Sequence, residues 1–110
     1  MTALLIFITK AWSGKNTKEY KALKGLKKEN LRDNMTNTEL ILNMLAEAST
    51  KDILKAVNPK NFVESKRIAK QGGTIAGNAR KELEAKTGKK VIAKVNAKNF
   101  LSNSNLSNKN

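Results

Sequence analysis

The side chains of this sequence that could act on a ligand are mostly those of lysine and arginine. Eight of them lie between residues 66 and 90, at short intervals that would place several on the same helix surface. A row of cationic side chains neutralises the phosphates of nucleic acid and gives salt-dependent affinity rather than base reading. A merely solvated face is the alternative. The candidate nucleic-acid contacts are Lys66, Arg67, Lys70, Arg80, Lys81, Lys86, Lys89 and Lys90.

The sequence offers little for catalysis. It contains no histidine and no cysteine, so imidazole bases, thiolate nucleophiles and the ordinary zinc ligands are absent. Glu82 and Glu84 are close in sequence, but residues two apart on a helix point to different sides. We therefore expect no catalytic residue, no cofactor and no metal, and a protein that is not an enzyme.

The cluster from Gly72 to Gly77 is the remaining motif of interest. At the start of a helix it could present backbone N–H groups to a phosphate. It lacks the lysine and hydroxyl of a nucleotide-binding loop, and no clear strand precedes it. A structural role is favoured: Gly72 and Gly73 turn the chain, and Gly77 lets two helices approach closely.

The charge of the chain is large and unevenly placed. The 110 residues carry a net charge of +13, a balance that favours polyanionic partners, above all nucleic acid. Residues 10–32 have eight basic and two acidic side chains, and residues 66–98 have ten and two, whereas residues 33–65 have three and five. Two basic lobes thus flank a mildly acidic centre. General solubilising charge is the alternative interpretation.

The acidic centre contains the helix around which we expect the fold to form. Thr36 and Glu39 have the spacing of a capping box, with Met35 placed as a hydrophobic staple, so a helix begins here. Asn43 and Glu47 fall on its polar face. Its apolar residues recur at intervals of three and four and are expected to form the core: Leu40, Ile41, Met44, Leu45 and Ala48.

Further short helices are predicted around this one. Residues 17–24 form a helix capped by Asn16 or Thr17, residues 26–35 form a helical turn, and the core helix continues to residue 57 after a new cap at Ser49 or Thr50. Another helix starts at Pro59 and breaks at the glycines, and a last one, capped by Thr74, ends at Gly88. The fold class is therefore all-α, a small bundle of about five helices.

The two ends of the chain are expected to differ from this bundle. Residues 1–14 form an apolar segment, too short to span a membrane, that covers the core or marks a truncated start. Residues 15–101 form the helical domain. The Ser/Asn-rich residues 102–110 form a disordered tail. Without a recognisable secretion signal, we expect a cytoplasmic protein.

Two separated motifs carry a resemblance to a known family. These are residues 25–35 with 39–47, and residues 69–73 with 76–80 and 83–92. They resemble the C-terminal region of phage and prophage antirepressor-like proteins of the Bro-N type, relatives of DNA-damage-inducible protein D, over about residues 12–99. The Bro-N domain, to which the family's DNA binding is usually attributed, is absent here. The resemblance implies a setting of phage, DNA and stress response, and it implies no catalytic residues.

These observations predict an accessory DNA-associated or oligomerisation domain of an antirepressor-like protein. The alternative is a protein-interaction module that binds a repressor or a recombination protein, or a non-functional remnant. An interaction module would present a compact apolar patch, for which Trp12, Tyr20 or Ile92 would be the centre. No membrane partner is expected, and the oligomeric state is open.

Overall fold

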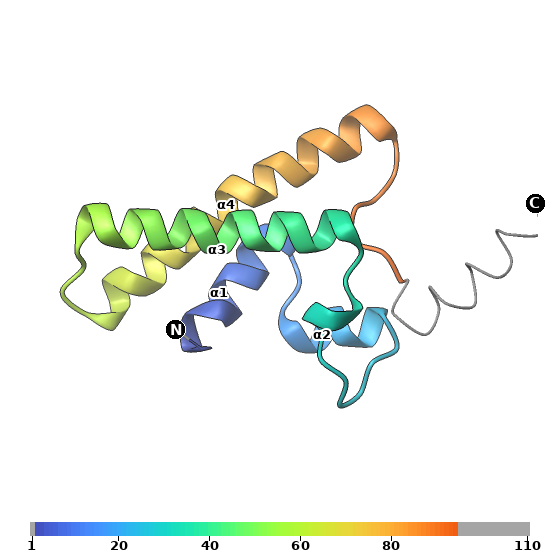
Figure 1. Cartoon of the computed structure of the whole chain (residues 1–110), viewed down its shortest axis with the longest axis horizontal. Coiled ribbons are helices and arrows are strands. Elements are labelled where there is room, and N and C mark those ends of the chain that lie inside the picture. The colour runs from blue at the N-terminus through green and yellow to red at the C-terminus, as the bar shows by residue number, and fades with distance from the viewer. Residues whose placement is uncertain (1, 95–110) are drawn as a thin grey trace, which may run out of the picture.

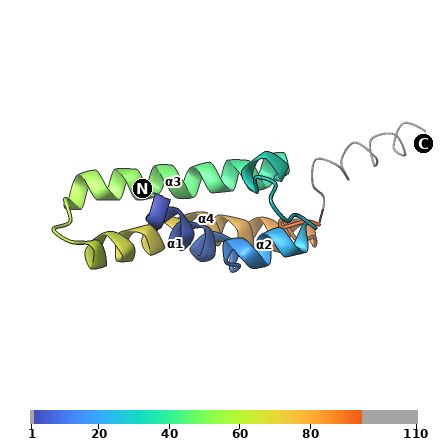
Figure 2. The same ribbon diagram turned by 90° about the horizontal axis from the view of Figure 1, so that it is seen from below.

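The computed structural model describes residues 2–94, in which all regular structure is helical. The prediction of an all-α fold is confirmed, but the number of helices is smaller than the five expected. Figure 2 shows two layers, with α3 in one and α1, α2 and α4 in the other. In Figure 1, α4 crosses behind α3, and both α3 and α1 pack against it. The elements are α1 (Thr2–Ser13), α2 (Thr17–Leu23), a 3-10 turn η1 (Arg32–Asn34), α3 (Asn37–Val57) and α4 (Phe62–Thr87).

Local sequence signals explain where the first helices begin. In α2 the Asn16 side chain accepts from the Glu19 N–H, and the Glu19 carboxylate accepts from the Asn16 N–H. The same reciprocal box joins Thr36 and Glu39 at the start of α3. Each box satisfies two N–H groups that a helix start leaves without partners. Both predicted starts are therefore confirmed.

The later helix ends, at Val57 and before Gly88, agree with the prediction, but the later caps and starts differ from it. Helix α3 continues to Val57 without a new cap, because Thr50 lies buried within it and donates its hydroxyl to the Ala46 carbonyl. Asn58 ends α3 in the left-handed conformation, so it does not cap the next helix. That helix is capped by Asn61, whose side chain accepts from the Glu64 N–H. Pro59 therefore belongs to the turn between the two helices.

The predicted break at Gly72 and Gly73 is wrong, because α4 runs through both. A Cβ atom on Gly72 would lie 2.0 Å from the Thr50 Oγ1 atom of α3, and one on Gly73 would lie 2.5 Å from the Ala11 Cβ atom of α1. The glycines thus serve the close approach of three helices. Thr74, which was expected to cap a new helix, lies inside α4 and donates to the Lys70 carbonyl.

The expected orientation of α3 is also wrong. Ile41 and Met44 are 64% and 50% exposed, and Leu45 and Ala48 are exposed as well. On the opposite face Leu42 and Ala46 belong to the hydrophobic core, and the buried polar side chains have partners inside the fold. Asn43 accepts a hydrogen bond of 3.1 Å from the Trp12 indole N–H. The remaining buried residues of α3 are Glu39, Leu42, Ala46 and Thr50.

A fully buried ion pair connects α3 with α2. The Lys24 ammonium lies 2.8 Å from Glu39 Oε1, and both side chains are completely inaccessible. The Tyr20 hydroxyl donates to the other Glu39 oxygen, and Lys24 also donates to the Ala93 carbonyl over 2.8 Å. Buried charges are tolerated only when paired and hydrogen-bonded in this way. The network therefore fixes α2 and residues 91–94 against the start of α3.

Helix α1 belongs to the same core. Ile8 and Trp12 are fully buried, and Leu4 is nearly so. Residues 2–13 thus form a helix that packs into the core. The predicted tail, residues 102–110, lies outside the described residues.

The burial of Tyr20 has a measurable consequence. Burial, together with the hydrogen bond to the Glu39 carboxylate, raises the pKa of the Tyr20 hydroxyl well above its ordinary value. In the unfolded chain tyrosine ionises near pH 10. The stability gained from the protonated hydroxyl is therefore complete below about pH 10 and is lost as the pH rises above that value.

Tyr20 is the only tyrosine, so near-ultraviolet absorbance of tyrosinate reports on it alone. We expect the folded protein at about pH 11 to show almost no tyrosinate, and the urea-unfolded protein to show nearly full ionisation. Ionisation near pH 10 in the folded protein would contradict the buried hydrogen bond.

Candidate nucleic-acid interface

The solvent-facing side of α4 carries a row of cations. Arg67, Lys70 and Lys81 are exposed, and Thr74 and Asn78, also exposed, lie between them. The intervals of three and four residues place all five on one face of the helix. Arg67 and Lys81 are about 21 Å apart along the axis, at 1.5 Å per residue. We call this row the α4 ridge.

The continuity of α4 is what creates the ridge. Successive helical residues are about 100° apart, so the ridge lies roughly opposite Gly72, which faces α3. A helix broken at residue 72 would have left the first two cations and Lys81 on separate segments. The close approach at Gly72 and Gly73 therefore holds the basic side chains in line on the outside of the fold.

The ridge cations are not neutralised within the described part of the chain. Residues 2–94 contain four ion pairs, at Lys10–Glu19, Lys24–Glu39, Arg32–Glu47 and Arg80–Glu84, and none includes a ridge residue. Cations without a neighbouring carboxylate keep their full field toward solvent. The ridge is thus electrostatically open to an anionic ligand.

Two of the eight candidate residues have structural partners instead. Lys66 places its ammonium 4.7 Å from the centre of the Phe7 ring, a cation–π contact with α1. Arg80 turns inward, donates from Nε to the Trp12 carbonyl over 2.8 Å and pairs with Glu84 over 2.9 Å. Its side chain is only 15% exposed. Arg80 is therefore not a member of the candidate interface, because its guanidinium already joins α1 to α4.

The partners of Glu84 explain its electrostatics. Partial burial by itself would raise the pKa of this carboxyl. The N–H of Val91, which donates to Glu84 Oε2 over 2.9 Å, and the Arg80 guanidinium outweigh burial and lower the pKa. Glu84 therefore stays ionised and ties residues 91–94 to α4.

The remaining three candidates lie apart from the ridge. Lys86 is exposed near the end of α4, roughly 120° around the helix from the middle of the ridge. Lys89 and Lys90 are exposed beyond Gly88, which ends the helix in the left-handed conformation. These three extend the positive field of the ridge without being in line with it.

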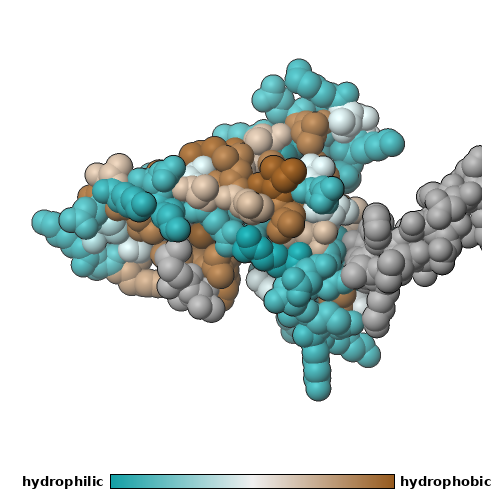
Figure 3. Space-filling view, viewed as in Figure 1, coloured by the Kyte–Doolittle hydropathy of each residue, from teal (hydrophilic) through white to brown (hydrophobic). Residues whose placement is uncertain are grey.

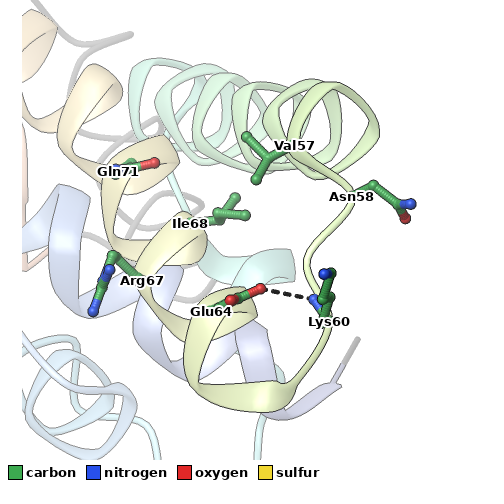
Figure 4. Close-up of a pocket in the computed structure, with 7 residues that line it drawn as sticks. All are labelled: Val57, Asn58, Lys60, Glu64, Arg67, Ile68 and Gln71. Atoms are coloured by element: carbon green, nitrogen blue, oxygen red, sulfur yellow. Dashed lines mark hydrogen bonds between the residues drawn. The ribbon is translucent and has the colours of Figure 1, made fainter.

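A shallow hollow near the α3–α4 turn contains Arg67 at its edge. Figure 4 shows Val57 and Ile68 pointing into the space between the two helices, while the Arg67 side chain points away from it. The Glu64 carboxylate, the acidic group of the hollow, accepts from the Lys60 N–H over 2.7 Å. That carboxylate is therefore engaged at the helix start rather than directed at a ligand.

The apolar surface of the protein lies elsewhere than the sequence predicts. Trp12 and Tyr20, expected as the centre of an apolar patch, are fully buried, and Ile92 is partly buried. The exposed apolar residues lie on α3 instead. A row of small or polar residues at helical spacing (Asn43, Ala46, Thr50) opposite a glycine-rich helix is the signal that could have located the inner face.

Comparison with protein-family models, with curated proteins and with solved structures finds no match for this chain. Within residues 2–94, no helix has both the length and the apolar character needed to cross a membrane. The same residues contain no group of three or more acidic side chains placed to hold a metal ion.

Proposed function

We propose that this chain is a nucleic-acid-associated domain that binds phosphates through the α4 ridge. The observation that carries the proposal is the alignment of Arg67, Lys70 and Lys81 on one exposed helix face, without ion-pair partners among residues 2–94. Duplex DNA carries one charge per about 1.7 Å of its axis with both strands counted, so a 21 Å length of duplex carries about twelve phosphate charges. Three contacts along such a line need no particular base sequence.

The buried aromatic residues favour this mode of binding over base stacking. Single-stranded nucleic acid is commonly held by aromatic side chains on which bases stack. Trp12 and Tyr20 have no exposed surface and are therefore not offered to bases. Phe62 is 52% exposed, but its ring packs edge-on with Phe7, and one such ring does not make a row on which successive bases stack. We infer duplex binding through phosphates, with little sequence preference. As the wider setting we propose a cytoplasmic, non-enzymatic accessory domain of a prophage antirepressor-like protein.

A second candidate function rests on the exposed apolar residues of α3. A protein-interaction module that binds a repressor or a recombination protein needs such a patch, and Ile41, Met44 and Leu45 provide one. Binding of such a partner would use the outside of α3 and not the α4 ridge, and it would depend less on salt than phosphate binding does. Substitutions in the α4 ridge would therefore leave binding of this partner unchanged.

The ridge can be tested with a charge-matched comparison. The variant with Arg67→Ala, Lys70→Ala and Lys81→Ala removes three exposed cations from the ridge. The control with Lys18→Ala, Lys27→Ala and Lys28→Ala removes three exposed cations from α2 and the loop after it. Fluorescence anisotropy of a labelled duplex at low salt measures the affinity of both variants for DNA.

We expect the ridge variant to bind at least about tenfold more weakly than the control variant, because it loses up to three phosphate contacts. Circular dichroism should show both variants folded, since all six side chains are exposed. Equal weakening by the two variants would mean that net charge, and not the ridge, determines binding.

A further inference from the structure

The outer face of α3 is apolar and uncovered by residues 2–94. Ile41, Met44 and Leu45 are 64%, 50% and 38% exposed, and Ala48 completes two turns of the same face. We call these four residues the α3 outer face. In Figure 3, brown surface gathers over the middle of α3 and continues onto the neighbouring part of α4. Exposed apolar residues of α4 include Ile75 and Leu83. Contiguous patches of this kind mark interaction sites.

The charge distribution indicates what can lie against this face. Two of the three acidic side chains of α3, Glu39 and Glu47, are paired with Lys24 and Arg32. The other charged residues of this helix are Lys51, Asp52 and Lys55, so the outside of α3 is close to neutral, whereas the basic lobes lie before and after residues 33–65. The α4 ridge points away from α3, since it lies roughly opposite Gly72. Two strongly basic copies of this chain therefore repel each other least when they meet through α3. An acidic partner would be drawn to the ridge instead.

The spacing along α3 is self-complementary in one arrangement. If two copies of α3 run antiparallel about a two-fold axis between Met44 and Leu45, Ile41 faces Ala48 of the second copy and Met44 faces its Leu45. A large side chain then meets a small one at each end, which lets the helices approach closely. Farther from the two-fold axis, Lys51 faces Thr38 of the second copy and Asp52 faces its Asn37. A parallel arrangement in register would place Lys51, Asp52 and Lys55 against their own copies.

We propose that the α3 outer face binds a second copy of this chain, with the two α3 helices antiparallel. A two-fold pair uses the same patch on both copies and closes after two, which is the commonest form of self-association. The patch of these four residues with Ile75 and Leu83 is small beside the roughly 800 Å² that each partner buries in a standard interface. We therefore expect a reversible dimer that dissociates on dilution. It would leave both α4 ridges on its outside.

Sedimentation without nucleic acid tests association independently of the proposed function. We expect the protein to change from monomer to dimer with rising concentration, and Met44→Glu with Leu45→Glu to weaken dimerisation at least about tenfold. Both positions are exposed, so the variant should remain folded by circular dichroism. A control matched in charge, Lys55→Glu, changes an exposed residue of the same helix beyond the apolar patch and should retain the dimer. A wild-type protein that is monomeric at about 100 μM would overturn the proposal.

The absence of cysteine allows the arrangement to be tested by cross-linking. A disulfide requires Cα atoms about 4.4–6.8 Å apart. An oxidised mixture of Ile41→Cys and Ala48→Cys chains should form mainly the mixed dimer. In the antiparallel arrangement Lys55→Cys is about 31 Å along the axis from its copy and should stay uncross-linked. Efficient cross-linking of Lys55→Cys, with none between positions 41 and 48, would overturn the antiparallel pair.

Discussion

Gly72→Ala is expected to destabilise the fold by about 3 kcal/mol or more. The new Cβ atom would lie 2.0 Å from Thr50 Oγ1 and 2.6 and 2.7 Å from the backbone N and Cα of Thr50. Alanine gains about 1 kcal/mol over glycine in helix propensity, which does not offset contacts this short. Because two of them are with backbone, α3 and α4 would have to move apart. Urea unfolding, followed by the circular dichroism of the helices, measures the loss.

Two variants separate this steric cost from other effects. Gly77→Ala makes the same change in the same helix, but its nearest contact would be 3.0 Å, to the Ala11 carbonyl oxygen. Its propensity gain should bring it to within about 1 kcal/mol of wild type. Thr50→Ala should not rescue Gly72→Ala, because the backbone contacts remain. A Gly72→Ala protein as stable as wild type would show that the two helices do not approach as closely as described.

Glu39→Gln is expected to destabilise the protein by about 3–5 kcal/mol, the usual cost of breaking a buried ion pair by removing one charge. The Lys24 ammonium would remain fully buried without an anionic partner at 2.8 Å. The amide would keep at most part of the hydrogen bonding to Tyr20 and to the Thr36 N–H. Against a total stability of about 5–15 kcal/mol for a typical domain, this loss would populate the unfolded state.

Glu19→Gln is the matched control, since Glu19 occupies the same position in the capping box of α2. Its side chain is 56% exposed, and Lys10 is 3.8 Å away, so the change should cost less than about 1 kcal/mol. Adding Lys24→Met to Glu39→Gln removes the second buried charge and should recover part of the stability. Urea unfolding followed by Trp12 fluorescence reports on all three variants. Equal, small losses for Glu39→Gln and Glu19→Gln would contradict a buried ion pair.

The helix class and the first helix starts could be predicted because they depend on neighbouring residues. The capping boxes at Asn16 and Thr36 act over three residues, and a local pattern is sufficient to recognise them. The resemblance to antirepressor-like proteins, in contrast, remains an expectation within the proposed function.

The inner face of α3 could not be predicted from its own apolar stripe. Which face is buried depends on partners distant in sequence, namely Trp12 for Asn43, Lys24 for Glu39 and Gly72 for Thr50. A polar face with buried partners and small residues can pack more closely than a face of isoleucine and leucine. The usual rule that the apolar face points inward therefore fails for α3, and it leaves an apolar surface available for binding.

The basic composition of residues 66–90 predicts the candidate site, but it does not predict which of these residues share one helix face. Arg67, Lys70 and Lys81 share a face only because α4 continues through its glycines, and this continuity follows from packing against α3 and α1. The inward turn of Arg80 likewise depends on Trp12, which lies 68 residues earlier. Sequence spacing alone therefore grouped residues that the fold separates.

The most direct test of the proposed function is the salt dependence of duplex binding by the intact protein and by the variant with Arg67→Ala, Lys70→Ala and Lys81→Ala. Affinity is measured by fluorescence anisotropy between about 50 and 200 mM salt, where each phosphate contact contributes about 0.9 to the slope of log affinity against log salt. We predict a steep slope for the intact protein and a slope shallower by about 3 for the variant. No binding at 50 mM salt, or the same slope for both proteins, would contradict the assignment of phosphate binding to the α4 ridge.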